Sequence, residues 1–144
     1  APDDWLLTCI DQVTPIDRLL AAYDDSQGIT EAFIRNALTN INRTYGGNLD
    51  VGSFGYVPFW DGRQERIDMR LRADEPMRAR FDGLDLDLEL GAGEEIRVEI
   101  SSKFRPDRFA VELAEAGFRQ PAEVGEQVFA DSEGDFALVL AQRG

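Results

Sequence analysis

The chain has 144 residues, enough for one compact domain with a sizeable core, and its 43% hydrophobic and 30% charged residues are typical of a globular protein. Its formal net charge of −13 argues against binding to a phosphate backbone, so we expect no nucleic-acid partner. Histidine is absent and Cys9 is the lone cysteine, which excludes an internal disulfide, Ser-His-Asp and Cys-His catalysis, and the usual zinc and haem sites.

No apolar run approaches the roughly 20 residues of a membrane span, so we expect no membrane contact. Asp3 and Asp4 stand where a signal peptide has its basic region, and a lone cysteine suits a reducing compartment. These features predict a cytoplasmic protein. The sequence begins with Ala1 rather than Met, as a trimmed or partial chain does.

The first predicted element is a short, nearly continuous apolar run at Trp5–Ile10. It predicts a strand buried on both faces, as in a parallel sheet. Asp11 follows at the carboxyl end, where open α/β sheets place ligands, although a turn or cap residue is the simpler interpretation.

Two amphipathic helices are predicted next. The first covers Pro15–Tyr23, with Thr14 as its cap and Pro15 in its first turn. The second is predicted to be capped by Thr30 and to run to the glycine pair that begins at Gly46.

From Tyr56 onward the pattern changes to that of strands, with alternating apolar and polar residues and short turns. In Glu65–Ala73 the polar side chains of Arg66, Asp68, Arg70 and Arg72 are expected on one face, opposite Ile67, Met69 and Leu71. The further predicted strands of this region are Tyr56–Trp60, Arg78–Phe81 and Leu84–Leu90, the last with its leucines pointing inward.

The stretch Gly91–Pro106 predicts a turn, a strand and a second turn, which complete an antiparallel set. Ile96, Val98 and Ile100 alternate on one face; the other is expected to carry Arg97, Glu99, Ser101 and Lys103. A carboxylate and a hydroxyl two residues apart on a strand are suited to a ligand with N–H donors. The alternative is a half-exposed strand with a solvated polar face.

After Pro106 we expect a helix at Phe109–Ala116 and strands at Glu126–Ala130 and Asp135–Ala141. The apolar strand Asp135–Ala141 is predicted to lie beside Trp5–Ile10 in one sheet. No strand leads through a glycine-rich loop into a helix, so no nucleotide or phosphate motif is present. The predicted class is α+β.

Six segments, taken together in order and spacing, resemble the C-terminal half of the histidine Nα-methyltransferases of ergothioneine biosynthesis. They are AYDDSQGIT (Ala22–Thr30), NRTYGGNLD (Asn42–Asp50), ERIDMRLRA (Glu65–Ala73), GEEIRVEISSKFRP (Gly93–Pro106), LAEAGF (Leu113–Phe118) and GDFALVL (Gly134–Leu140). The family uses S-adenosylmethionine (SAM) as cofactor and trimethylates the α-amine of histidine.

The resemblance implies that residues 1–14 and 105–144 belong to a Rossmann-like methyltransferase domain. Residues 15–104 would form a substrate-binding domain, an antiparallel sheet with helices. The family's SAM-binding motifs and part of its histidine pocket lie upstream of Ala1. The implied partners are histidine or a related amino acid, and the N-terminal half of the methyltransferase or a second chain that replaces it.

The resemblance also implies five substrate-binding residues and neither a catalytic residue nor a metal. Tyr23 would bind the substrate carboxylate, and Thr30 would lie near the imidazole, directly or through water. Met69 would contact the ring, and Glu99 and Ser101 would bind the imidazole nitrogens. Taken alone, Tyr23 and Met69 are better interpreted as core residues. Two further interpretations of the chain stay open: a non-catalytic binding or interaction module, and one half of a split methyltransferase.

Overall fold

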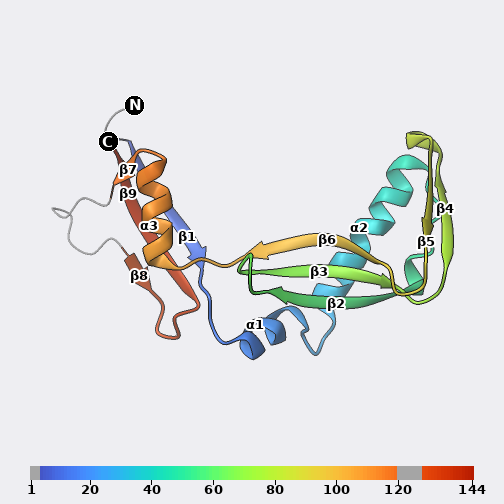
Figure 1. Ribbon diagram of the computed structural model, residues 1–144, viewed down its shortest axis with the longest axis horizontal. Coiled ribbons are helices and arrows are strands. Elements are labelled where there is room, and N and C mark those ends of the chain that lie inside the picture. The colour runs from blue at the N-terminus through green and yellow to red at the C-terminus, as the bar shows by residue number, and fades with distance from the viewer. Residues whose placement is uncertain (1–3, 120–127) are drawn as a thin grey trace. The chain divides into compact units, whose positions relative to one another are not determined.

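The computed structural model of the chain describes residues 4–119 and 128–144. Over these ranges the chain is an α+β protein with three α-helices and antiparallel sheets, as predicted (Figure 1). It divides into two compact units. The first contains the described residues up to Pro15, the turn Arg63–Glu65 and the described residues from Ser102 onward; the second contains Ile16–Gly62 and Arg66–Ser101. The assignment of these units to the two expected domains stays a prediction.

An antiparallel sheet forms the centre of the first unit. The elements of this unit are β1 (Trp5–Asp11), α3 (Pro106–Glu115), β7 (Phe118–Arg119), β8 (Val128–Ala130) and β9 (Phe136–Arg143). Strand β9 pairs with β1, β7 and β8, and Trp5 of β1 lies opposite Gln142 of β9. The predicted pairing of the first and last apolar strands is therefore confirmed.

Among the described residues, one face of this sheet is covered and the other is open. The covered face forms a core from Ile10, Leu113, Ala137, Val139 and Ala141. On the open face Trp5 and Leu7 are 49% and 63% exposed, and Phe136 and Leu138 are 51% and 43% exposed. The expectation that Trp5–Ile10 is buried on both faces in a parallel sheet is wrong for the described residues, because β1 pairs antiparallel with β9 and only one face of the sheet is covered.

The second unit contains two helices and two sheets. Its elements are α1 (Ile16–Tyr23), α2 (Ile29–Tyr45), a 3-10 turn (Val51–Ser53), β2 (Phe54–Asp61), β3 (Arg66–Ala73), β4 (Met77–Phe81), a second 3-10 turn (Asp82–Leu84), β5 (Leu86–Leu90) and β6 (Glu95–Ser102). Strand β3 lies between β2 and β6, and β4 pairs with β5 in a separate hairpin. Ile34 and Leu38 of α2 join Ile67 and Leu71 of β3 in the core.

The second helix ends as predicted but begins differently. Gly46 adopts a left-handed conformation with φ of 61° at the C-terminal end of α2, which glycine does without strain. At the other end Thr30 is not the cap. The carboxylate of Asp25 accepts hydrogen bonds from the backbone N–H groups of Ile29 and Thr30, at 3.0 and 2.9 Å.

Two of the other predicted boundaries need correction, and a third is described only in part. The predicted strand Leu84–Leu90 begins only at Leu86, and Leu84 and Leu86 are 48% and 46% exposed because, of the leucines in this segment, only Leu88 and Leu90 pack against the core. Helix α3 begins at Pro106, which suits a first helical turn. Of the predicted strand Glu126–Ala130, residues 128–130 form β8 and the first two lie outside the described residues.

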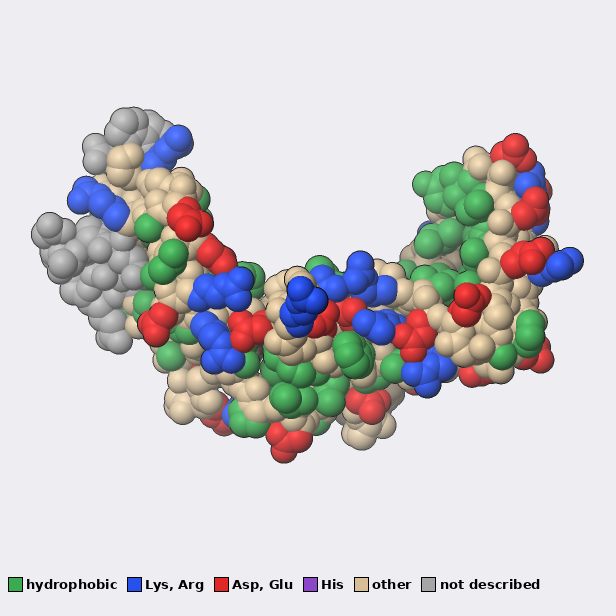
Figure 2. All heavy atoms as spheres, viewed as in Figure 1, with side chains coloured by type: hydrophobic (Ala, Val, Ile, Leu, Met, Phe, Trp, Pro, Cys, Tyr) green, Lys and Arg blue, Asp and Glu red, His purple; other side chains and the backbone are tan. Residues whose placement is uncertain are grey.

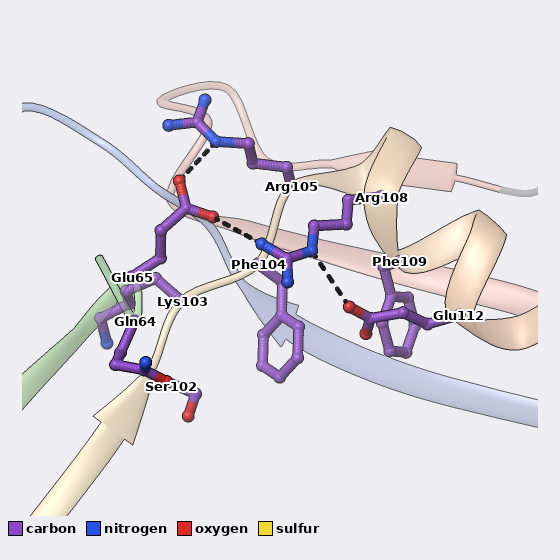
Figure 3. A pocket seen from close by; sticks show the side chains of 9 residues that line it. All are labelled: Gln64, Glu65, Ser102, Lys103, Phe104, Arg105, Arg108, Phe109 and Glu112. Carbon is purple, nitrogen blue, oxygen red and sulfur yellow. Dashed lines mark hydrogen bonds and ion pairs between the residues drawn. The ribbon is translucent and has the colours of Figure 1, made fainter. Parts of the chain in front are cut away.

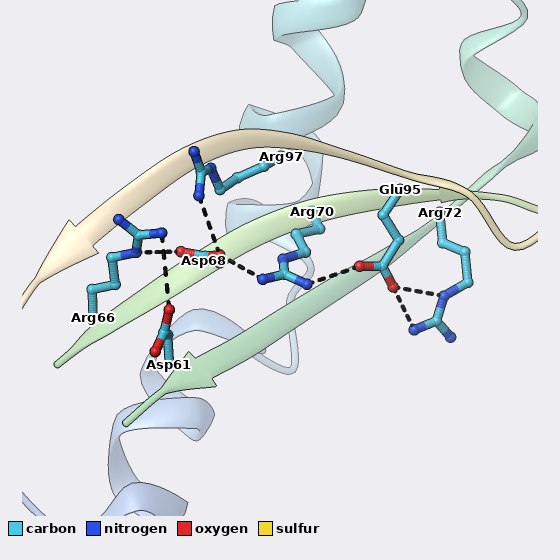
Figure 4. Close-up of polar contacts among 7 residues, drawn as sticks. All are labelled: Asp61, Arg66, Asp68, Arg70, Arg72, Glu95 and Arg97. Carbon is cyan, nitrogen blue, oxygen red and sulfur yellow. Dashed lines mark hydrogen bonds and ion pairs between the residues drawn. The ribbon is translucent and has the colours of Figure 1, made fainter. Parts of the chain in front are cut away.

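The polar face of β3 is not a simple solvated face, because Asp68 has no exposed surface. Its carboxylate accepts hydrogen bonds from Arg66 Nε at 2.7 Å and Arg70 Nη2 at 2.6 Å, and Arg97 of β6 lies 3.8 Å away (Figure 4). Burial raises the pKa of Asp68, but the hydrogen bonds from Arg70 and Arg66 outweigh it and lower the pKa overall. Basic and acidic side chains accordingly intermingle over β3 and β6 (Figure 2).

Lys103 is buried as well, although the alternation had placed it on the polar face of the strand. Its ammonium group pairs with the carboxylate of Asp11 at the end of β1. The Lys103 backbone N–H donates to the carbonyl of Glu65, and the Phe104 N–H donates to the carbonyl of Asp11, both at 2.8 Å. A buried ammonium needs such a partner, and Asp11 is therefore a structural ion-pair residue of the first unit.

We predict that Asp68→Asn destabilises the second unit by about 3 kcal/mol, because it leaves arginine side chains without their buried countercharge. The measurement is urea unfolding followed by tryptophan fluorescence in a Trp5→Phe background. Trp5 and Trp60 are the two tryptophans of the chain, so Trp60 then reports the second unit alone. The matched control is Asp87→Asn, which removes an exposed ion pair with Arg80 and should cost less than about 1 kcal/mol. Equal losses for the two variants would contradict the prediction.

A second prediction concerns Asp25 and pH. Hydrogen bonds from the backbone of Thr30 and Ile29 lower the pKa of Asp25 from 3.8 to about 2. A lowered carboxyl pKa stabilises the fold above the unfolded value, and this stabilisation disappears as the pH falls from about 4 toward 2. Asp25→Ala should therefore lower the urea midpoint at pH 7, and its difference from wild type should shrink between pH 4 and pH 2. A pH-independent difference would show that Asp25 acts through something other than its charge.

Candidate functional site

Two hydroxyl groups from distant parts of the sequence meet in the second unit. Tyr23 is the last residue of α1, and Ser101 lies near the end of β6, 78 residues later. Their side-chain oxygens are 2.7 Å apart in a partly buried position, and either can be the donor. The structure therefore brings together two of the five residues predicted to bind substrate.

Packing against one core explains how these two segments meet. Leu19 is the buried residue of α1, and Tyr23, one helical turn further on, packs against the core of the second unit. Val98 of β6 packs against the same core. The alternation of β6 then changes, because Ile100 is 44% exposed whereas Ser101 is half-buried beside Tyr23.

A third hydroxyl holds the end of α1. Tyr56 of β2 donates its hydroxyl hydrogen to the backbone carbonyl of Tyr23 at 3.0 Å. Burial, followed by the negative charges of Asp24 and Asp25, raises the pKa of Tyr56 to about 12. This phenol is therefore a neutral donor throughout the physiological pH range.

The carboxylate of Glu99 is open to solvent. Glu99 is exposed on β6, where it borders a shallow depression together with Arg97, Val98 and Ile100. No described residue donates a hydrogen bond to its side chain. Such a carboxylate is available as an acceptor for an N–H group of a ligand.

The structure places Thr30 at the start of a helix and Met69 in the core of the second unit. Thr30 lies in the first turn of α2, where Asp25 fixes its backbone N–H, so the connection from Tyr23 to this helix is held in place. Met69 of β3 is 4% exposed and belongs to the core against which Tyr23 packs. The roles of all five residues toward a ligand stay predictions.

The first unit contains a small cavity of about 130 Å³, below the roughly 300 Å³ at which small-molecule pockets begin. Its charged groups satisfy one another: Glu65 pairs with Arg105 at 2.7 Å and with Arg108 at 3.7 Å, and Arg108 pairs with Glu112 at 3.3 Å (Figure 3). Phe104 and Phe109 pack edge to face beside them. This cavity is part of the scaffold of the first unit.

Within the described residues, neither a cluster of metal-binding side chains nor a glycine-containing connection from a strand to an α-helix is found. These residues contain no group of three or more acidic or cysteine side chains placed to hold a metal ion. The strand-to-helix connections Gln12–Pro15 and Lys103–Arg105 contain no glycine that would let a cofactor approach the backbone. Across residues 4–119 and 128–144, no helix has the length and apolarity needed to cross a membrane.

Sequence reasoning missed three residues around these features. Tyr56 looked like an ordinary strand residue, because its partner is a backbone carbonyl 33 residues away. Asp25 could have been predicted from the sequence, since aspartate shortly before a helix is a common capping residue. The burial of Lys103 could not have been predicted, because the alternation of the strand indicated that its side chain lies on the polar face.

Comparison with known proteins identifies the family. A model of the family described as histidine-specific methyltransferase, SAM-dependent, matches residues 1–143. The chain is 44% identical over 142 residues to the histidine N-alpha-methyltransferase of Mycolicibacterium smegmatis and 43% identical over 142 residues to that of Mycobacterium tuberculosis. These matches cover 99% of the chain, which spans only 43% of the length of each relative and corresponds to their C-terminal part. The chain thus belongs to the family of histidine-specific, SAM-dependent methyltransferases.

Proposed function

We propose that this chain is the C-terminal part of an enzyme that transfers methyl groups from SAM to the α-amine of histidine, and that its second unit supplies part of the amino-acid pocket. The observation that carries the proposal is the hydroxyl pair of Tyr23 and Ser101, 2.7 Å apart. Each lies in a segment that resembles the family, and the exposed carboxylate of Glu99 lies on β6 two residues before Ser101. By the same resemblance we assign the reaction to ergothioneine biosynthesis in the cytoplasm.

In the proposed complex these residues bind both ends of histidine. Tyr23 donates to the carboxylate, Glu99 accepts the N–H of the imidazole, and Ser101 binds its other nitrogen. Thr30 and Met69 border the ring. Fixing the carboxylate and the imidazole leaves the α-amine between them in one position, and orientation of this kind contributes up to roughly 7–11 kcal/mol in favourable cases. No general base of this chain is needed for that role.

We further propose that the second unit is the substrate-binding domain and the first unit is part of the Rossmann-like domain. The open face of the first sheet supports this assignment. Trp5, Leu7, Phe136 and Leu138 form a continuous exposed apolar surface, since Leu7 lies opposite Leu140, and Cys9 opposite Leu138, in the register of β1 and β9. Such a surface marks an interface. The occupant we propose is the N-terminal part of the enzyme, because the relatives extend well beyond the aligned region.

A non-catalytic binding module is the second candidate for the chain by itself. The observation that favours it is the lack of a glycine-containing strand-to-helix connection in the part of the chain that the structure describes. In that case the chain would hold an amino acid without performing the transfer.

We predict that the chain alone binds SAM much more weakly than the full-length enzyme does, because its sequence has no glycine-rich strand-to-helix loop and the resemblance places the SAM-binding motifs upstream of Ala1. Isothermal titration calorimetry of both proteins measures the difference. A micromolar dissociation constant for the chain alone would contradict the prediction.

For Glu99→Ala in the full-length enzyme, we expect a ten- to hundredfold loss of histidine affinity with unchanged SAM affinity. A charge-assisted hydrogen bond in a pocket contributes about 1.5–3 kcal/mol. Ser101→Ala should cost less, because a neutral hydroxyl contributes about 1 kcal/mol. Histidine titrations of both variants provide the measurement.

The control for Glu99 is Glu89→Ala, which removes an exposed carboxylate of β5 and should leave histidine affinity unchanged. Thermal melts complete the test, since Glu99 is exposed and its removal should hardly change stability. Unchanged histidine affinity combined with a large fall in melting temperature would assign Glu99 to the scaffold.

A further inference from the structure

Two hydrogen bonds in series connect three elements of the second unit. The hydroxyl of Tyr56 on β2 donates to the backbone carbonyl of Tyr23 at the end of α1. The hydroxyl of Tyr23 in turn meets that of Ser101 on β6 at 2.7 Å. Tyr56 thus contacts the site through the backbone of a residue whose side chain belongs to it.

Helix α1 depends on such an external contact. It has eight residues, too few for a stable isolated helix, and the carbonyls of its last turn have no partner within the helix. Its last turn carries no basic side chain that would bind them. The Tyr56 hydroxyl satisfies the final carbonyl and thereby fixes the residue from which the Tyr23 side chain projects.

The position of Tyr56 is fixed by its strand and by the core of the second unit. It lies opposite Leu71 in the register of β2 and β3, and Leu71 has no exposed surface. Its ring packs against the core of the second unit. A donor held by a strand and by the core restricts the end of α1 more than a flexible surface side chain would.

We propose that Tyr56 is a positioning residue of the amino-acid site, which orients the hydroxyl of Tyr23 toward the substrate by binding the carbonyl of the same residue. This inference rests on the proposed function. It adds a residue that contacts no substrate atom and that acts on histidine binding alone.

The test is Tyr56→Phe in the full-length enzyme, which removes the hydroxyl and keeps the ring. We expect the KM for histidine to rise about three- to tenfold, the effect of one neutral hydrogen bond, with kcat and the KM for SAM unchanged. The matched control is Tyr45→Phe at the end of α2, which removes a tyrosine hydroxyl elsewhere in the second unit and should leave all three constants unchanged.

A double-mutant cycle with Tyr23→Phe separates positioning from general stability. If Tyr56 acts through the Tyr23 hydroxyl, Tyr56→Phe should raise the KM for histidine in the wild-type background and leave it unchanged once that hydroxyl is absent. Equal effects in both backgrounds, or an unchanged KM in the single variant of an active enzyme, would overturn this inference alone. A wild-type enzyme that does not bind histidine would overturn the proposed function together with it.

Discussion

The second unit depends on the packing of one helix against one sheet. Ile34 of α2 and Ile67 and Leu71 of β3 have no exposed surface, and Phe54 of β2 is 1% exposed. Burial of each such side chain contributes about 1.5–3 kcal/mol to the stability of the fold. It holds β3 in place at the centre of the sheet. Tyr23 itself and the β6 residues Ile96 and Val98 are only partly buried against this core. The candidate site therefore lies at the periphery of a rigid scaffold, where side chains stay accessible to a ligand.

The two units differ in how completely they bury their own apolar side chains. In the second unit the carboxylate of Asp68 is enclosed by arginines, and large side chains from helix and sheet fill the core. The core of the first unit contains two alanines among its five buried residues and lies on one side of the sheet, and tryptophan, leucine and phenylalanine side chains are exposed on the other side. This contrast agrees with a substrate-binding part that folds around its own core and a sheet that needs further chain to cover it.

Hydrophobic periodicity correctly predicted the elements that have the same surroundings along their whole length. Glu65–Ala73 alternates strictly, and its apolar residues are buried as expected, since a strand between two neighbours keeps one face toward the core throughout. It failed where the environment changes along one element. In β6 the alternation holds at Ile96 and Val98 but not at Ile100, and Lys103, directly after the strand, is buried although the alternation placed it on the polar face. The chain passes from the second unit into the first at Ser102.

The candidate site could be predicted only in part from the sequence pattern. The polar pair of Glu99 and Ser101 could be identified on β6 from spacing, but the resemblance was needed to connect it with Tyr23. The contact of Tyr56 with a backbone carbonyl leaves no trace in hydropathy or spacing. A hydrogen bond between segments 33 residues apart is a property of the fold, so only the structure reveals it.

Hydrogen-bond counting constrains how the proposed pocket exchanges partners when histidine enters. A neutral imidazole has one donor and one acceptor nitrogen. If Glu99 accepts from the first, Ser101 must donate to the second, and its single hydroxyl hydrogen is then unavailable to Tyr23. If Tyr23 donates to the substrate carboxylate, as proposed, it likewise cannot donate to Ser101. The proposed complex therefore requires the 2.7 Å bond between the two hydroxyls to open, because neither hydroxyl hydrogen would remain for it. In that proposal, each hydroxyl exchanges this bond for one to histidine.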